Sequence, residues 1–204
     1  MSDYSLIQEK KRLGSLVGYW DFLSGSFLDL SSNANNGTTS NVEFGGHRAL
    51  LFGSAGRVVV SDSSELQGDT WTLVVFGELN KQSATGRLIY KRDAGGTQYD
   101  WQITATGFQL EDGANTRTIA LSATDSICNA VSFTDGGTPV HYQNGLPQGN
   151  YSGTVAIAVD NADIVLGNDH NFTSPCPDSV RGFMIFNEQL TATEHAQLYG
   201  ELMS

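Results

Sequence analysis

The chain is poor in cysteine. Its 204 residues include two, Cys128 and Cys176, whereas small secreted scaffolds that depend on disulfides carry several pairs. Cys128 begins an apolar segment and Cys176 lies between two prolines, so we expect two free thiols. A chain of this length buries roughly 70% of its unfolded surface on folding, and its core therefore needs no disulfide to stabilise it.

Long apolar runs are missing as well. No stretch of 18 or more apolar residues occurs, so no transmembrane helix is expected. The first residues, MSDYS, lack the basic start and the apolar centre of a secretory signal. We therefore expect a protein that remains where it is synthesised, or one that is exported without a signal peptide.

Positive charge is scarce. The chain carries 11 basic and 22 acidic residues, a formal net charge of −11. Nucleic-acid phosphates and anionic lipid surfaces are both recognised through basic patches, so neither is an expected partner. The one basic cluster is KKR at residues 10–12.

Glycine and short apolar segments are what the chain has in abundance. It contains 23 glycines against 4 prolines, and turn signals separate segments in which hydrophobicity alternates with period two. These predicted strands are residues 58–60, 71–76, 88–90, 101–104, 108–110, 118–121, 130–133, 140–142, 155–159, 164–166 and 183–186. Many short strands at regular spacing predict two packed antiparallel sheets, with Trp20 and Trp71 in their core.

Both ends of the chain carry helix signals. Thr191 and Glu194 form a capping-box pattern before an apolar face of Leu198, Tyr199 and Leu202. Residues 1–15 contain a second, shorter pattern that ends at Gly14, which predicts an arm outside the domain. A helix of about two turns is unstable alone, so this arm is expected to dock on its own domain or on a neighbour.

The order of the motifs carries a family resemblance. LVGYWDF at 16–22 is followed by LDLSSNANNG at 28–37, ALLFGSAGRVVV at 49–60, GDTWTLVVF at 68–76 and AVSFTDGGTPVHYQNG at 130–145. With the ending FMIFNEQLTATEHAQLY at 183–199, these segments resemble the landmarks of laminin-G-like domains of the concanavalin A-like lectin and glucanase superfamily. The resemblance implies an all-β fold, a concanavalin A-like β-sandwich (jelly roll) of two antiparallel sheets with short N-terminal and C-terminal helices. It divides the chain into an arm, 1–15, and a laminin-G-like jelly-roll domain, 16–204.

Calcium is the cofactor that the resemblance raises. Asp29 and Asn33 match the acidic first loop with which many relatives bind calcium through several oxygens. The second contribution of the family, an acidic pair before the last strand, is replaced here by Arg181 and Gly182. An arginine there opposes a cation, so we expect no cofactor and a loop in which Asp29 hydrogen-bonds its own backbone, with calcium kept as the alternative.

Catalytic patterns are absent from the sequence. Related glucanases carry E-x-D-x-x-E, which this chain lacks, and Glu111 and Asp112 are adjacent and therefore point to opposite faces of a strand. The four histidines are scattered without zinc spacing. We therefore expect no enzyme, and a polysaccharide hydrolase or lyase is the least favoured function.

A glycan site would need an aromatic ring beside polar loop side chains. Tyr99, Trp101, Tyr142, Asn168 and Asp169 are the candidates in this chain. A free-standing carbohydrate-binding lectin module is accordingly one functional hypothesis.

The leading hypothesis is a non-catalytic structural and adhesion protein, a phage-type virion decoration or fibre protein that docks through its N-terminal arm. The docking residues are expected to be Leu6, Ile7, Lys10, Lys11, Arg12 and Leu13. The partners would be other copies of the chain or other virion proteins, and the location would be the virion, with a cytoplasmic or signal-independent exported protein as the alternative. The sequence names no host, glycan or assembly symmetry.

Overall fold

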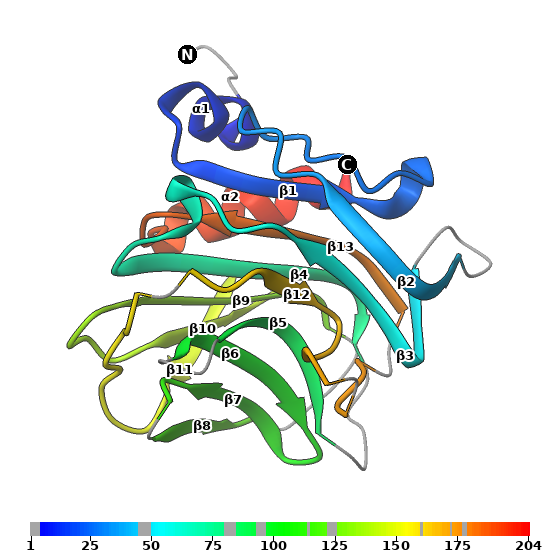
Figure 1. Ribbon diagram of the computed structural model, residues 1–204. Helices are drawn as coiled ribbons and strands as arrows, with labels where there is room; N and C mark the ends of the chain where they lie inside the picture. The colour runs from blue at the N-terminus through cyan, green and yellow to red at the C-terminus, as the bar shows by residue number, and fades with distance from the viewer. Residues whose placement is uncertain are drawn as a thin grey trace.

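The protein is a sandwich of two antiparallel sheets with a helix near each end of the chain (Figure 1). The structure, a computed structural model, describes residues 5–44, 50–79, 85–92, 97–113, 115–121, 126–159, 161–171, 173–176 and 179–204. No described helix has the length and apolar character needed to cross a membrane. The predicted fold class, a β-sandwich of two antiparallel sheets with short terminal helices, is confirmed.

The first sheet contains six strands in the order β1, β13, β4, β9, β10 and β11. Their bounds are β1 Leu16–Asp21, β13 Ser179–Phe186, β4 Thr70–Leu79, β9 Ser126–Thr134, β10 Val140–Gln143 and β11 Leu146–Asn150.

The second sheet contains seven strands in the order β2, β3, β12, β5, β6, β7 and β8. Their bounds are β2 Gly37–Phe44, β3 Leu50–Val60, β12 Ile164–Leu166, β5 Gly86–Arg92, β6 Thr97–Thr104, β7 Gly107–Glu111 and β8 Thr116–Ala120. Strand β3 joins the sheets, because its first residues pair with β13 and its last three pair with β12. The helices are α1 Leu6–Leu13 and α2 Ala192–Met203, and two 3-10 turns, η1 Phe22–Ser24 and η2 Ser64–Leu66, follow β1 and β3.

The main core lies between the sheets. Alternate residues of most strands point into it, and Trp20, Trp71 and Trp101 are all fully buried there. The expected burial of Trp20 and Trp71 is therefore confirmed. Cys128 and Cys176 are both buried and are not joined by a disulfide, as expected.

A second apolar cluster covers the outer face of the first sheet. Leu198 and Leu202 of α2 and Leu6 of α1 pack there against Phe76 and Met184. Thr191 caps α2 with the expected reciprocal box, accepting from the Glu194 amide while the Glu194 carboxylate accepts from Thr191. Both helices thus close one outer face of the sandwich, and Figure 1 shows them on the same side of it.

The N-terminal helix packs on its own domain, which is one of the two docking alternatives expected for it. Lys10 is 7% exposed and its Nζ lies 2.8 Å from Glu188 and 2.5 Å from Glu194. The carboxylate of Glu201 accepts hydrogen bonds from Ser5 Oγ and from the backbone N–H groups of Leu6 and Ile7. Lys10 and the N-terminal amides of α1 thus interact with carboxylates of α2 and of the segment before it.

The remaining predicted strands are confirmed, apart from residues 155–159. The amides there donate elsewhere, Val155 to the carbonyl of Gly137, Ala156 to the carboxylate of Asp112 and Ile157 to that of Asp135. Strands β2 and β11 are not among the predicted strands, because the asparagine, glycine and proline content of their segments is typical of loops.

Candidate functional site

The outer face of the second sheet is polar at β6. Trp101 and Ile103 belong to the core between the sheets, so the residues that alternate with them, Asp100, Gln102 and Thr104, point to the opposite face. On the neighbouring strand β7 they lie opposite Glu111, Gln109 and Gly107. Strand alternation thus places a carboxylate, an amide and a hydroxyl on the side away from α1 and α2 (Figure 1), where Asp100, Gln102 and Thr104 are all buried.

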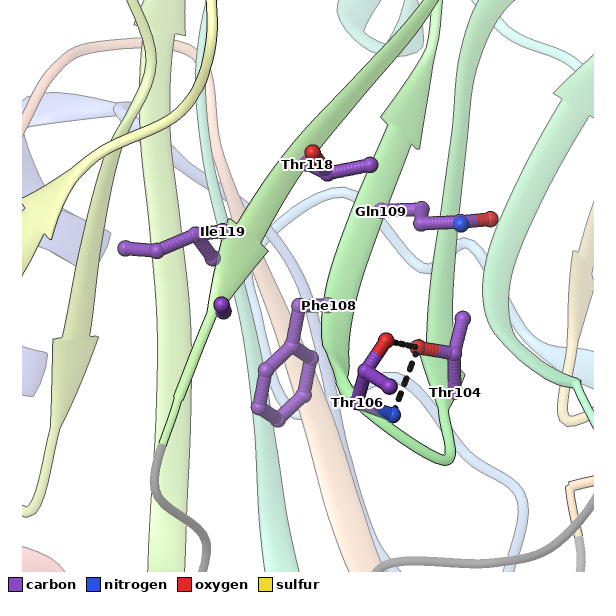
Figure 2. Close-up of a pocket in the computed structure, with 7 residues that line it drawn as sticks. Thr104, Thr106, Phe108, Gln109, Thr118 and Ile119 are labelled. Atoms are coloured by element: carbon purple, nitrogen blue, oxygen red, sulfur yellow. Dashed lines mark hydrogen bonds between the residues drawn. The ribbon is translucent and has the colours of Figure 1, made fainter.

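A pocket of about 120 Å³ lies at the turn between β6 and β7. It is lined by residues of three neighbouring strands and the turn, namely Thr104, Thr106, Phe108, Gln109, Thr118, Ile119 and Ala120, of which Phe108 and Ile119 belong to the core between the sheets. Figure 2 shows Thr104 and Thr106 linked at the turn, with Gln109 and Thr118 on the adjoining strands. Thr104 Oγ1 accepts from the Thr106 amide at 3.3 Å and donates to the Gly107 carbonyl at 3.1 Å, so the turn holds one side of the pocket in place.

Gly107 determines how closely β7 and β8 approach beside the pocket. Its φ is +155°, and a Cβ at this position would lie 2.0 Å from the carbonyl oxygen of Ile119. Only glycine fits such a contact without displacing the neighbouring strand. The spacing of the pocket walls thus depends on a residue that contributes no side chain to it.

An ion-paired cluster lies next to the pocket on the same face. Arg87 of β5 donates from Nε to both oxygens of Asp100, at 3.1 and 3.0 Å, and from a terminal nitrogen to Asp169 at 2.7 Å and Ser174 Oγ at 2.8 Å. Its guanidinium carbon stands 5.0 Å from the centre of the Tyr90 ring. Arg87 therefore ties strands β5 and β6 to the segment that follows β12.

Burial separates the protonation behaviour of the two carboxylates that Arg87 contacts. Desolvation raises the pKa of Asp100 to about 6, although the charge of Arg87 opposes this change. Burial also acts to raise the pKa of Asp169, but hydrogen bonds from Thr173 and the charge of Arg87 outweigh it, and the pKa is lowered. Asp100 thus keeps its proton to a higher pH than Asp169 does.

The carboxylates do not form an accessible acid–base pair. Asp100 and Glu111 are cross-strand partners, an arrangement from which glycosidases could draw an acid and a nucleophile. However, Asp100 is fully buried and Arg87 occupies both of its oxygens. Asp112 is also buried and ion-paired, with Arg117 at 3.2 Å, so neither aspartate is free to meet a substrate.

Ser132 and His195 form a hydroxyl–imidazole contact on the other sheet. Ser132 Oγ lies 2.9 Å from His195 Nε2, and the same hydroxyl bonds Thr72 at 2.8 Å. Both residues are 3% exposed, and burial lowers the pKa of His195 to about 4. The Ser132 hydroxyl is buried beneath α2, where no substrate can reach it. The contact therefore serves to hold α2 on the first sheet.

The five residues expected to bind a glycan are not brought together. Tyr99 and Trp101 are fully buried between the sheets, where Trp101 donates to the Tyr151 hydroxyl at 3.1 Å. Tyr142 is on the opposite outer face, stacked at 3.6 Å on His195. These three rings have no face to offer a ligand, which corrects that part of the prediction.

Asn168 and Asp169 of the predicted set stabilise the segment after β12. Asn168 is fully buried and accepts from the amides of Asp169 and Ser174, while Asp169 accepts from Asn171 and Thr173. Asp169 is bonded to Arg87, and neither Asn168 nor Asp169 lines the pocket.

Asp29, predicted as a metal ligand in the calcium alternative, is used by its own loop. One carboxylate oxygen accepts from the amides of Tyr19 and Ser31, and the other accepts from Ser31 Oγ and the amide of Asn35. Asn33 donates to the carbonyls of Leu16 and Val17. The expected hydrogen bonding of Asp29 within its loop is confirmed, and the described residues contain no group of three metal-ligating side chains.

The six predicted docking residues of the arm differ in how far their side chains are exposed. Leu6 and Lys10 are buried against the domain and Ile7 packs at the edge of the same cluster. Lys11 donates to the Leu30 carbonyl at 2.7 Å, whereas Arg12 and Leu13 are exposed, Leu13 by 58%. Docking of a partner on the exposed part of α1 stays a prediction.

The pocket residues were missed in the sequence. Strand β6 contains their signal, because TQYDWQIT alternates polar residues with large apolar ones, and each second residue of an outer strand must face away from the core. The aromatic residues of this segment, Tyr99 and Trp101, are the buried half of the alternation.

No protein-family model matches the chain, and no curated protein matches it in sequence. Solved structures do match its fold. The binding domain of paraclostridial mosquitocidal protein 1 has a TM-score of 0.74 at 13% identity, over 98% of this chain and 53% of that one. The binding domain of botulinum neurotoxin DC in complex with rat synaptotagmin II has a TM-score of 0.71 at 14% identity, over 92% and 52%.

A structure of botulinum neurotoxin type C, whose cell entry depends on interaction with two ganglioside molecules, has a TM-score of 0.71 at 14% identity, over 95% and 53%. The chain thus spans about half the length of the structures it matches. These likenesses establish the β-sandwich fold, and the relatives are binding domains.

Proposed function

We propose that the protein is a non-catalytic binding module whose ligand is a glycan, held at the pocket between β6, β7 and β8. The observation that carries the proposal is the pocket itself, an open depression lined by the hydroxyls of Thr104, Thr106 and Thr118 and the amide of Gln109. Sugars are recognised through such groups, because each hydroxyl of the ligand both donates and accepts.

The structural relatives support the class of function. They are described as binding domains, and the ligands named with them include gangliosides and a protein receptor. Because this chain corresponds to half of each relative, only the general class, a module that binds a glycan or a receptor, is carried over.

The non-catalytic part of the proposal rests on the state of the acids. Asp100, Asp112 and Asp169 are all at least nine-tenths buried and each is ion-paired with an arginine. Hydrolysis of a glycoside needs two carboxyl groups that reach the scissile bond, and this face presents Glu111 without a second accessible partner among the described carboxylates.

A structural role in a virion is the second candidate. The exposed Arg12 and Leu13 on α1 favour it, since they remain available to another copy or another virion protein. The use of Leu6 and Lys10 within the domain removes the larger part of the docking surface on which this role depended, so the glycan-binding module is preferred.

Glycan binding can be tested with an array of neutral and acidic oligosaccharides, followed by titration calorimetry of the best ligand. The variants Gln109→Ala and Thr118→Ala each remove one hydrogen-bonding group and should weaken binding about 2- to 10-fold, as a lost hydrogen bond is worth about 0.5–1.5 kcal/mol. Thr116→Ala is the matched control, an exposed threonine on the same strand outside the pocket. An array without any binder, or equal losses in Thr116→Ala and Thr118→Ala, would refute the proposal.

A further inference from the structure

The two helices cover an apolar face without taking part in either sheet. Phe76 and Phe186 belong to the apolar cluster on the outer face of the first sheet, where α1 and α2 contribute Leu6 and Leu198. Figure 1 shows both helices on this side of the sandwich. Every pairing in the two sheets joins one strand to another. The helices can therefore separate from the sheet while all strand pairing is retained.

A chain of hydrogen bonds anchors α2 to the first sheet through His195. Thr72 Oγ1 accepts from the Leu190 amide at 3.0 Å and donates its single proton to the Glu188 carbonyl at 2.8 Å. The Ser132 hydroxyl, which lies 2.8 Å from Thr72 Oγ1, must therefore donate to it. Because that proton is then in use, Ser132 Oγ accepts from His195 Nε2 at 2.9 Å. The contacts thus assign the hydrogen of the neutral ring to Nε2, and Nδ1 is the nitrogen that takes up a proton in acid.

The surroundings of His195 favour a neutral ring over a charged one. The residue is 3% exposed, and its ring stacks on that of Tyr142 at a centroid distance of 3.6 Å. Burial lowers the pKa of His195 from 6.5 to about 4, although the negative charge of Glu194 acts in the opposite direction. The Glu194 carboxylate already binds Lys10 and the Thr191 amide. A second proton on the ring therefore has to be held where burial disfavours charge.

We propose that α1 and α2 form an acid-released cover of the first sheet and that His195 is its latch. Near neutral pH the uncharged imidazole donates to Ser132 and holds α2 in place. In acid the protonated imidazole moves into solvent, and α2 separates from the sheet together with α1, which is bonded to it through Glu201. The released state exposes the apolar outer face of the first sheet and retains the sandwich.

The two pKa values of His195 set the size of the effect. In the released state the ring is in water and its pKa returns to 6.5, against about 4 in the closed state. The released state binds more protons between these values, so the closed state loses stability as the pH falls from about 6.5 to about 4. Between pH 7 and pH 5 the equilibrium constant for release should rise about 20-fold.

The ion pair beside His195 keeps its charges in this pH range. Burial acts to lower the pKa of Lys10, but hydrogen bonds to Glu188 and Glu194 outweigh it, and the pKa is raised above 10.5. Burial acts to raise the pKa of Glu194, but hydrogen bonds from Lys10 and Thr191 outweigh it, and the pKa is lowered from 4.5. The contact between α1 and the start of α2 is therefore still ionised at pH 5.

The remaining titratable groups that could contribute are unaffected by release or stay neutral. Burial raises the pKa of Tyr142 above 10.0, so the ring beneath His195 carries no charge. His141, the next residue of β10, belongs to the buried interior, and burial lowers its pKa to about 3. Asp100 lies on the second sheet. His141 and Asp100 keep their folded surroundings when the helices leave, so they alter the pH dependence of global unfolding and not that of release.

Hydrogen exchange of the full chain at pH 7 and pH 5, corrected for intrinsic exchange rates, measures release directly. The protection of α2 should fall about 20-fold at pH 5, and that of α1 should fall with it. The protection of β4 and β13 should be retained, because these strands pair with each other and not with the helices.

His195→Gln removes the titration and retains an amide that can donate to Ser132 in place of Nε2. The protection of α2 in this variant should differ by less than about 2-fold between the two pH values. The comparison uses the ratio within one protein, so a lower overall stability does not obscure it. His170→Gln is the matched control, the same substitution at a half-buried histidine after β12, and it should retain the 20-fold fall.

NMR of the imidazole supplies a measurement that needs no substitution. At pH 7 the hydrogen of His195 should reside on Nε2, and the ring should titrate well below 6.5. A ring that titrates near 6.5 would overturn the proposal, as would an equal fall of α2 protection in His195→Gln and His170→Gln. Loss of protection in β4 and β13 together with α2 would show unfolding of the whole sandwich in acid, and it would refute a separate release of the helices.

Discussion

Leu6 and Leu13 offer a direct test of how the N-terminal helix is held. Both are leucines of α1, and their exposed fractions are 2% and 58%. Leu6 packs in the cluster that covers the outer face of the first sheet. Replacement of each leucine by alanine changes the same atoms in the same short helix, so the difference between the two variants measures burial against the domain.

The magnitude follows from that burial. Truncation of a buried leucine to alanine costs about 2–5 kcal/mol through lost burial and the cavity left behind. We expect about 2–3 kcal/mol for Leu6→Ala, the lower part of that range, because α1 lies at the margin of the cluster and can shift to close part of the cavity. For a domain of this size the melting temperature should fall by about 5–10 °C, whereas Leu13→Ala should stay within about 0.5 kcal/mol of the parent protein.

Urea unfolding followed by tryptophan fluorescence measures both variants, since Trp20, Trp71 and Trp101 are buried in the main core. An unchanged dependence on urea concentration would show that the same surface unfolds in each protein. Equal stabilities of the two variants would refute the docking of α1 on its own sheet and would restore a free arm. Rapid hydrogen exchange throughout α1 in the parent protein would contradict it in the same way.

Three further predictions address the core, the buried acid and the metal. Trp71→Ala and Phe183→Ala should each lower the free energy of unfolding by about 3–5 kcal/mol, and a loss below about 1 kcal/mol in chemical denaturation would contradict their complete burial. Burial raises the pKa of folded Asp100 to about 6 from an ordinary value of 3.8. Between these two pH values the folded protein binds more protons at this group than the unfolded chain does. The contribution of Asp100 to stability therefore falls as the pH rises from about 4 to 6. Asp100→Asn should remove that contribution, and carbon-13 NMR should find the Asp100 carboxyl titrating near 6; titration near 4 would refute the assignment. Removal of divalent ions with EDTA should shift the melting temperature by less than about 5 °C, and a larger decrease, of order 2 kcal/mol, would favour the calcium alternative.

The fold was predictable from the sequence because its signals are local. Alternation in TWTLVVF and FMIF, and the Thr191–Glu194 box, each depend on residues within one strand or one helix turn. Strand β11 escaped prediction because its sequence, LPQGN, has a composition typical of turns and all five of its residues are exposed. Its pairing with β10 depends on tertiary structure rather than on its own propensity.

The site was less predictable because its properties depend on residues distant in sequence. Asp100 is ionisable in any tripeptide, but its raised pKa requires burial in the folded protein, where Arg87 joins it to Asp169, about 70 residues later. The sequence suggests that Lys10 is available to a partner, but in the structure it forms ion pairs with Glu188 and Glu194 of its own chain. A charged residue in the sequence indicates that a partner is needed, and it does not indicate whether that partner belongs to the same chain.

The two outer faces of the sandwich differ in the chemical character of their outward residues. On the first sheet, the outward positions include Val74, Phe76, Met184 and Phe186, and the two helices cover them. On the second sheet, the outward positions of β6 are Asp100, Gln102 and Thr104, which need hydrogen-bond partners rather than an apolar cover. Water can satisfy such groups at the exposed end of the face, and a polar ligand can replace that water. The same strand alternation that assigns the helices to one face therefore leaves polar groups on the other, where the proposed site lies.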